Sequence, residues 1–167
     1  LEIGIPAMGV REQESIRAIL DCNLPVRQMG WCRATSHDLE KAIDSGLKSV
    51  DLSIPTSDIL MNVKHLRRDT IMRNLETTIM TAKNEGLFVC IGAEDASRAD
   101  CAFLHELAAY VSALGADRFR FCDTVGILTP TRTYEAISAL TSTYPIAVEM
   151  HTHNDFGICP IWILLFI

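Results

Sequence analysis

The sequence of 167 residues lacks several features that would place it in a common protein class. It contains no run of basic residues, and 15 lysines and arginines stand against 21 aspartates and glutamates. The resulting pI near 5.3 argues against a nucleic-acid binder, which needs a positively charged surface. A membrane-spanning helix needs about 20 apolar residues, and no stretch of the chain is that long. We therefore expect neither a nucleic acid nor a membrane as a partner.

The cysteines contain no Cys-x-x-Cys pair, and three of them lie in apolar, strand-like stretches. This pattern is typical of buried, reduced thiols and predicts a cytoplasmic protein. The first residues, Leu1 to Ile5, already resemble a core strand, so we expect no signal peptide. Because no initiator methionine is present, we expect the chain to begin inside a longer gene product. The six cysteines are Cys22, Cys32, Cys90, Cys101, Cys122 and Cys159.

The last ten residues, 158–167, carry no charge and show no amphipathic period. They are too few to cross a bilayer, and as a free end they would expose apolar surface. The segment is therefore either a packed terminal strand or sequence from outside the original reading frame, and we favour the second. The sequence thus predicts a catalytic domain at residues 1–157 followed by a foreign apolar tail.

Helix-like segments separate short apolar runs along the rest of the chain. The clearest helix covers Ser97 to Leu114, with a capping-box-like start at Ser97 and Asp100 and a stop at Gly115. A second helix starts at Thr129 and Pro130. A third covers Thr70 to Glu85. The expected strands are Leu1 to Ile5, Val26 to Trp31, Ser49 to Ser53, Leu87 to Ile91, Arg118 to Cys122 and Ile146 to His151.

Six strands alternating with five helices predict one α/β domain with parallel strands. Polar residues follow nearly every strand, as the active site of a (β/α)8 barrel requires. A doubly wound sheet would gather them at one switch point, and the chain has no Gly-x-Gly-x-x-Gly pattern. A complete barrel usually needs about 250 residues. The sequence therefore predicts an incomplete (β/α)8 TIM barrel with about six of its eight strands.

The most informative motif is His-Thr-His-Asn-Asp, which closes the last expected strand. Alternate residues of a strand point to the same face, so His151 and His153 can both reach one ion. Neutral imidazoles suit zinc, iron and similar divalent metals, and Asn154 and Asp155 could support the pair. The alternative is that one or both histidines are surface residues or hydrogen-bonded core residues.

An ordered set of motifs resembles the acyl-CoA-dependent Claisen condensing enzymes and their lyase relatives. This family includes isopropylmalate synthase, homocitrate synthase and hydroxymethylglutaryl-CoA lyase. The Trp31-Cys32-Arg33 strand and the loop from Glu94 to Asp100 are most similar to homocitrate synthase of the nitrogen-fixation type. The resemblance covers Leu1 to Gly157. Its motifs are Leu1 to Pro6, Trp31 to Arg33, Leu52 to Pro55, Gly92 to Arg98, Asp123 to Gly126 and His151 to Asp155.

The resemblance implies an acyltransferase that condenses acetyl-CoA with 2-oxoglutarate to give homocitrate. It also implies a divalent metal (Mg, Mn or Zn) and a cytoplasmic homodimer when the protein is full length. A metal of this kind polarises the carbonyl under attack, while a base removes a proton from the acetyl methyl group. The alternatives are condensation with another 2-oxo acid, as in isopropylmalate synthase, a different metal-dependent barrel enzyme such as an aldolase or hydrolase, or a non-catalytic fragment.

The resemblance also assigns residues. It makes His151 and His153 metal ligands, and it places Glu2 and Glu94 at the reacting centre. Asp123 becomes a candidate acid or base. Thr124 is assigned to the substrate carboxylate, and Arg33 is a second candidate for binding a carboxylate.

Each assignment has a structural alternative. Glu94 and Asp95 could charge the N-terminus of the following helix, and Thr124 could be a turn residue. Glu2 could pair with a basic residue inside the barrel mouth, because a buried carboxylate needs a partner. Arg33 could pair with an acidic residue on a neighbouring loop. Arg98 is expected on the helix surface. The remaining histidines, His37, His65 and His105, are expected to be solvated.

The chain departs from the family at both ends. The family begins with an Arg-Asp-Gly-Glu-Gln strand, which supplies a metal-binding aspartate, and it continues beyond residue 157 with a polar helix and another strand. Without these parts two histidines leave a metal under-coordinated, and the sheet has open edges. We therefore expect the isolated chain to be inactive.

Overall fold

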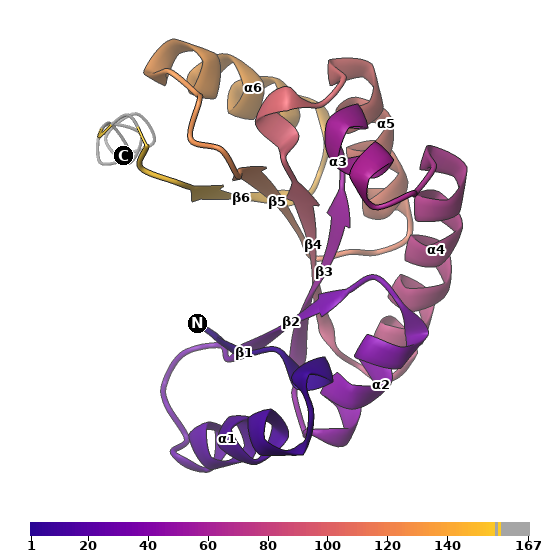
Figure 1. Ribbon diagram of the computed structural model, residues 1–167, viewed down its shortest axis with the longest axis vertical. Coiled ribbons are helices and arrows are strands. Elements are labelled where there is room, and N and C mark those ends of the chain that lie inside the picture. The colour runs from indigo at the N-terminus through magenta and orange to yellow at the C-terminus, as the bar shows by residue number, and fades with distance from the viewer. Residues whose placement is uncertain (156, 158–167) are drawn as a thin grey trace.

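The computed structural model describes residues 1–155 and 157 of the chain. Its centre is a six-stranded sheet in which every strand pairs in parallel with the next strand along the chain. The sheet is strongly curved, with β1 and β6 at the two edges of its open side (Figure 1). This is the incomplete (β/α)8 barrel that the sequence predicts. The strands are β1 (Glu2–Gly4), β2 (Met29–Arg33), β3 (Ser49–Pro55), β4 (Phe88–Glu94), β5 (Arg118–Asp123) and β6 (Ala147–Thr152).

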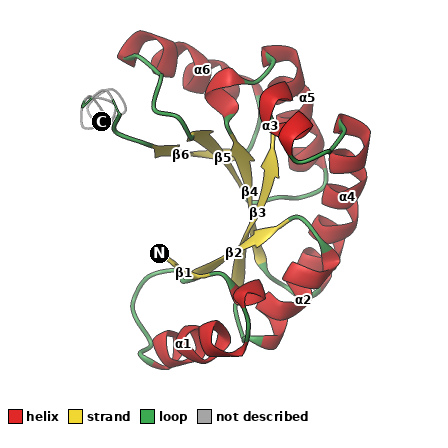
Figure 2. Cartoon of the chain, in the orientation of Figure 1, coloured by secondary structure: helices red, strands yellow, loops and turns green. Residues whose placement is uncertain are grey.

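The helices cover the outer, convex side of the curved sheet (Figure 2). Two α-helices, not one, connect β3 to β4, because the Asp58–Val63 segment forms a separate short helix before the long one begins. The helices are α1 (Val10–Asp21), α2 (Ser36–Asp44), α3 (Asp58–Val63), α4 (Arg68–Asn84), α5 (Cys101–Ala113) and α6 (Pro130–Thr143), with short 3-10 turns η1 (Pro6–Met8) and η2 (Ala96–Arg98).

Two helix starts test the capping predictions. The side chain of Thr129 accepts a hydrogen bond from the backbone N–H of Arg132 at 3.4 Å, which confirms the predicted start of α6. The predicted start of a helix at Ser97 is wrong. The chain there forms the turn η2, and α5 begins only at Cys101, where Asp100 accepts the N–H of Ala102 at 3.0 Å.

The apolar core lies between the sheet and its helices. Side chains on the outer face of the strands, such as Val50, Leu52, Ile91 and Phe119, are fully buried there. They pack with the apolar stripe of α5, including Leu107, in one continuous cluster. The alternation of strand side chains therefore directs the apolar residues outward to the helices and leaves the inner face for other residues.

The inner face of the sheet is polar, whereas the interior of a complete barrel is usually filled by branched apolar side chains. Asp51 of β3 and Arg120 of β5 are both buried on it. Gly92 of β4 lies between them, and a Cβ atom there would come within 2.8 Å of Asp51 Oδ1. The absence of a side chain at Gly92 thus makes room for a charged cluster.

Only some of the cysteines that the structure describes are buried, whereas the sequence predicts buried thiols. Cys32, Cys90 and Cys122 lie buried in strands, and burial raises the pKa of the Cys32 and Cys122 thiols to about 12. Cys22 and Cys101 are exposed, because they lie at the end of α1 and the start of α5.

Within residues 1–155 and 157, no helix has both the length and the apolar character needed to cross a membrane. The predicted apolar tail, 158–167, lies outside the described residues, and the domain boundary at residue 157 stays a prediction.

Candidate active site

A cavity of about 190 Å³ lies on the inner face of the sheet, toward the C-terminal ends of the strands. It brings together five of the residues that the resemblance assigns to the site: Glu2, Glu94, Thr124, His151 and His153. The strand register explains why residues so far apart in sequence meet. Parallel pairing puts Gly92 beside Ser53, Ala93 beside Phe121, and Cys122 beside His151. The other residues that line the cavity are Trp31, Asp51, Ser53, Arg120 and Cys122.

His151 and His153 lie at the end of β6 with their ring centroids 5.4 Å apart and their planes inclined by 59°. The backbone N–H of His153 donates to the carbonyl of Asp123 at 3.2 Å, which holds the end of β6 against β5. Burial lowers the pKa of His151, and the nearby positive charge of Arg120 lowers it further. A lowered pKa favours the neutral imidazole, which is the form that binds metal ions.

The histidine pair fits part of a metal site. Two neutral imidazoles from one strand end can serve as ligands, and the carboxylate of Glu2 lines the same cavity. Among the residues that the structure describes, however, no three His, Cys, Asp or Glu side chains are grouped closely enough to hold an ion. A complete site of the usual three protein ligands would therefore need a further ligand.

Glu94, the last residue of β4, is held from two sides. Its Oε1 accepts the Ser53 hydroxyl at 2.8 Å, and its Oε2 accepts Lys64 Nζ at 2.5 Å. Only 17% of the Glu94 side chain is exposed. Both carboxylate oxygens are thus held by side chains of other elements, and Glu94 lines the cavity.

Thr124 and Asp95 connect the ends of β4 and β5. The backbone N–H of Asp95 donates to Thr124 Oγ1 at 2.8 Å. The Asp95 carboxylate is fully buried; it accepts the Ser57 hydroxyl and two nitrogens of Arg98, at 2.8 and 2.6 Å. Arg98 is thus paired with Asp95, and Asp95 fixes the loop after β4 without lining the cavity.

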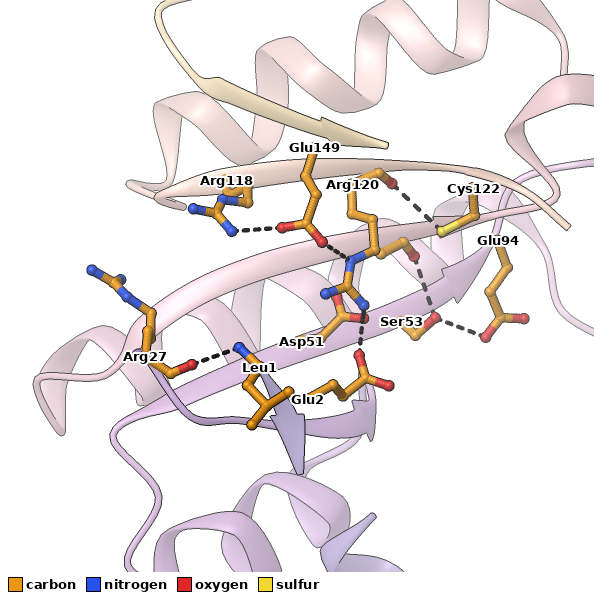
Figure 3. A network of polar contacts seen from close by, with 11 residues as sticks. Leu1, Glu2, Arg27, Asp51, Ser53, Glu94, Arg118, Arg120, Cys122 and Glu149 are labelled. Atoms are coloured by element: carbon orange, nitrogen blue, oxygen red, sulfur yellow. Dashed lines mark hydrogen bonds and ion pairs between the residues drawn. The ribbon is translucent and has the colours of Figure 1, made fainter. Parts of the chain in front are cut away.

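The floor of the cavity is a charged cluster centred on Arg120 (Figure 3). Its Nη1 donates to Glu2 Oε2 at 2.6 Å and to Asp51 Oδ2 at 2.7 Å, while its Nε donates to Glu149 Oε1 at 2.8 Å. Arg118 donates to the other oxygen of Glu149 at 2.5 Å. Glu2 therefore has the basic partner that the sequence leaves open. Burial raises the pKa of Asp51 to about 7, although Arg120 opposes that shift.

Two of the predicted site residues do not reach the cavity. Arg33 forms a bidentate pair with Asp38 of α2, with both distances at 2.8 Å, so it has an acidic partner on the helix that follows its own strand. The carboxylate of Asp123 is buried and accepts the backbone N–H groups of Ile127 and Leu128 at 3.1 and 3.0 Å. It therefore closes the loop after β5 instead of facing a substrate.

The sequence analysis missed five charged residues of this region: Asp51, Arg118, Arg120 and Glu149 in the floor, and Lys64 beside Glu94. The sequence does contain a pattern that could have identified Asp51 and Arg120 as site residues. Each lies in the middle of an otherwise apolar strand, and a charge buried there requires a partner of opposite sign. Lys64 gave no comparable signal, because it follows the short helix α3 in a polar stretch.

The curved parallel sheet and the polar residues at its carboxyl ends define an incomplete barrel of the (β/α)8 class. The match to known sequences is more specific: a sequence model of the HMGL-like family covers residues 1–159, and the chain belongs to that family.

Among its relatives are 2-isopropylmalate synthase 2 of Caldanaerobacter subterraneus subsp. tengcongensis, 43% identical over 160 residues, and homocitrate synthase 1 of a Nostoc species, 44% identical over 158 residues. Each match covers 94% of this chain but only 41% and 42% of the respective relative. The chain thus spans about two fifths of their length.

The fold also matches a solved HMG-CoA lyase from Acenitobacter baumannii, in complex with coenzyme A and 3-methylmalate. The TM-score is 0.79 at 13% identity, and the match covers 91% of this chain and 52% of the lyase. At this level of identity the likeness concerns the fold alone.

Proposed function

We propose that this chain carries part of the active site of an acyltransferase that condenses acetyl-CoA with 2-oxoglutarate to give homocitrate. The observation that carries the proposal is the meeting of two adjacent imidazoles with Glu94 and Thr124 in one cavity at the carboxyl ends of parallel strands. The relationship to a homocitrate synthase supports the choice of reaction. An acyl-CoA thioester as the donor is what the resemblance to the acyl-CoA-dependent condensing enzymes implies.

In this proposal His151 and His153 are two ligands of a divalent metal (Mg, Mn or Zn), with the remaining protein ligand coming from outside this chain. The metal, when bound, supplies a Lewis acid that polarises the keto group of the acceptor. Glu2 lies in the same cavity and is held by Arg120. Its role is to line the reacting centre beside the imidazoles.

Glu94 is the candidate base for the acetyl methyl group. Ser53 and Lys64 fix its carboxylate, so its position is set before a substrate arrives. Thr124 is suited to bind the acceptor. Its Oγ1 already accepts the N–H of Asp95, which leaves its hydroxyl hydrogen to donate to a carboxylate.

Asp123 and Arg33 receive different roles. Because the Asp123 carboxylate accepts two backbone N–H groups, we assign it the positioning of the loop that carries Thr124. A substrate carboxylate could engage Arg33 only by replacing Asp38, so we assign Arg33 to the attachment of α2.

A second candidate is condensation with 2-oxoisovalerate, as in isopropylmalate synthesis. The chain is 43% identical to 2-isopropylmalate synthase 2 and 44% identical to homocitrate synthase 1, so sequence identity supports both acceptors almost equally. The nitrogen-fixation assignment and the homodimer stay predictions, since they rest on the resemblance alone.

The proposal is tested by calorimetric titration of the 167-residue chain with 2-oxoglutarate, with and without Mg²⁺, Mn²⁺ or Zn²⁺. We expect binding only when a metal is present. His151→Ala and His153→Ala should each weaken metal binding by more than the roughly 10- to 100-fold that loss of a mere supporting residue costs. His37→Ala, a change at an exposed histidine of α2, is the matched control and should bind normally. Metal-independent binding, or binding that survives both histidine changes, would contradict the proposal.

Turnover is a separate question. The chain spans about two fifths of its synthase relatives, and we expect it to release no thiol from acetyl-CoA when assayed alone with 2-oxoglutarate and metal. Robust turnover by these 167 residues would show that the ligand set is already complete.

A further inference from the structure

The charged floor of the cavity is more elaborate than the structural needs of a sheet explain. It contains two guanidinium groups, those of Arg118 and Arg120, and three carboxylates, those of Glu2, Asp51 and Glu149. When all five groups are ionised, the floor carries one net negative charge. Only 8% of the Arg120 side chain is exposed, yet it lines the cavity.

Asp51 is the unusual member of this cluster. Its side chain is 1% exposed, and its Oδ2 accepts a hydrogen bond from Arg120. Within the described part of the chain, Oδ1 has no nitrogen or oxygen partner, and the only further hydrogen bond to this carboxylate comes from the neighbouring Cys90 thiol. Burying an ionised oxygen without a partner is costly, whereas a neutral carboxyl group can donate its proton to a ligand.

The strands other than β2, which places Trp31 beside Asp51, bring titratable groups toward this carboxylate. Its own strand pairs with β4, where Cys90 lies directly beside it in register. Burial first, and the charge of Asp51 next, raise the pKa of the Cys90 thiol. The Cys32 thiol of β2 lies on the opposite face, because Cys32 pairs with Leu52 and its Sγ donates to the carbonyl of Asp38 in α2. Glu2 of β1, Glu149 of β6, and Arg118, Arg120 and Cys122 of β5 complete the surroundings. Burial, the largest cause, holds the pKa of Asp51 at about 7, and Arg120 is the main group that opposes it.

The depth of Arg120 also matters. On β5 and β6, Cys122 pairs with His151 and Arg120 pairs with Glu149. Arg120 therefore lies two residues below the imidazoles on the inner face, a distance of roughly 7 Å along a strand. Consider a 2-oxo acid that is bound at the level of the imidazoles. If two carbons separate its keto carbon from a second carboxylate, that carboxylate can point toward Arg120.

The bonds that Arg120 makes in the cluster use Nε and Nη1. Among the described residues Nη2 makes no hydrogen bond, so this edge of the guanidinium is left for a further acceptor. Arg120 and Asp51 both line the cavity that such a carboxylate would enter, and they lie next to each other in the cluster (Figure 3).

We propose that Arg120 and Asp51 together recognise the far carboxylate of a dicarboxylic 2-oxo acid, with Arg120 supplying the charge and Asp51 donating a hydrogen bond as a neutral acid. This inference rests on the proposed function and names the acceptor class of the same site. At a pH above the pKa of Asp51, one proton is taken up from solvent by its carboxylate when the dicarboxylate binds. No bond within the substrate changes in this step.

The same cluster explains how the site would treat an apolar acceptor. With Asp51 ionised, the floor is negative and repels a second carboxylate, whereas a branched apolar group such as that of 2-oxoisovalerate brings no charge. The choice between the two acceptors is therefore coupled to the proton on Asp51. A carboxylic acid that stays neutral near pH 7 and donates a hydrogen bond is an established device of enzyme sites.

The experiment compares 2-oxoglutarate with 2-oxoisovalerate by calorimetry on the 167-residue chain with Mg²⁺. Titrations at pH 8 in two buffers of different ionisation enthalpy count the protons taken up. We expect about one proton for 2-oxoglutarate and none for 2-oxoisovalerate. Both acids depend on the same histidines, so protonation of the metal ligands changes both affinities by the same factor. The ratio of the two affinities is therefore independent of that protonation. That ratio should fall about tenfold between pH 6 and pH 8.

Two variants separate the roles. Asp51→Asn keeps a hydrogen-bond donor but cannot titrate, so it should retain the preference for 2-oxoglutarate and lose both the proton uptake and the pH dependence. Arg120→Lys keeps the net charge of the floor but not the planar fork, and it should weaken binding of 2-oxoglutarate at least about tenfold and binding of 2-oxoisovalerate clearly less. Circular dichroism confirms that each variant is folded, and Asp51→Asn alone decides the proton linkage should the other not fold.

The outcomes are distinguishable. If both acids bind but proton uptake is equal, or if Asp51→Asn leaves the pH dependence intact, only the inference about Arg120 and Asp51 is overturned. If neither acid binds in the presence of metal, the proposed function fails and this inference fails with it.

Discussion

The middle and the outer strands of the sheet differ in what they contribute. β3 and β4 are seven residues long and almost wholly buried, and they form the stable centre of the fold. β1 has three residues, and both β1 and β6 are largely exposed or half-buried. Yet Glu2, His151 and His153 lie on or next to these two strands. The scaffold is thus built in the middle, while part of the proposed chemistry lies at edges that a complete barrel would cover.

The charged floor links the two regions, so its disruption gives the largest expected effect. Arg120→Gln would leave Asp51 buried without its cation and separate Glu2 of β1 from β5. We expect a loss of roughly 3–5 kcal/mol in the free energy of unfolding, measured by urea denaturation at pH 8. Adding Asp51→Asn should restore much of the loss. Equal instability of the single and double variants would show that the pair is not coupled.

A matched pair of truncations compares the middle and the edge directly. Ile91→Ala in β4 removes a fully buried side chain and should cost about 2–5 kcal/mol. Val148→Ala in β6 removes a side chain that is only partly buried against the core, so it should cost clearly less. Urea denaturation of both variants measures the difference, and similar costs would mean that β6 is as firmly packed as the centre.

The pH dependence of stability isolates Asp51. Its pKa is about 7 in the folded chain and 3.8 in its ordinary, unfolded-like state, so the folded chain holds an additional proton between these values. The stability of the native chain should therefore fall as pH rises from about 4 to about 7, by at most about 1.4 kcal/mol per pH unit, and level off above. Asp51→Asn should remove this component. Parallel denaturation curves for both proteins across the window would show that Asp51 is already ionised.

The smallest effect concerns the thiols. Cys22 and Cys101 are exposed, whereas Cys32, Cys90 and Cys122 are buried with raised pKa values. At pH 8 an aromatic disulfide reagent should label the first two quickly and the three buried thiols only after unfolding. Mass spectrometry of tryptic peptides identifies the modified residues. Early labelling of Cys122 would indicate that the edge of the sheet near β6 opens readily.

Much of the fold could be predicted from the sequence because local signals were strong. The strands that are buried on both faces stood out as apolar runs, and Thr129 with Pro130 marked the start of α6. The start of β2 was placed too early, because Val26 is apolar yet exposed in the loop before Met29. The start of α5 was missed because Asp95, in a left-handed conformation and paired with Arg98, forms a turn that competes with the expected helix.

In the candidate site, too, some residues could be predicted from local sequence patterns and others could not. The histidine pair followed from the two-residue period of a strand, and the structure places both rings in one cavity. The Asp51 and Arg120 pair joins residues 69 positions apart, and it depends on the curvature of the sheet, which no local pattern encodes. Arg33 and Asp123 could not be judged in advance, because their partners, Asp38 and the N–H groups of the following loop, are decided by side-chain direction.

The central claim is that His151 and His153 bind one divalent ion. The most direct test is a long-range ¹H–¹⁵N spectrum of the imidazole nitrogens during titration of the 167-residue chain with Zn²⁺. We expect the resonances of His151 and His153 to shift together near one equivalent, while those of His37, His65 and His105 stay in place. A shift of only one of the two, or none in either, would contradict the account.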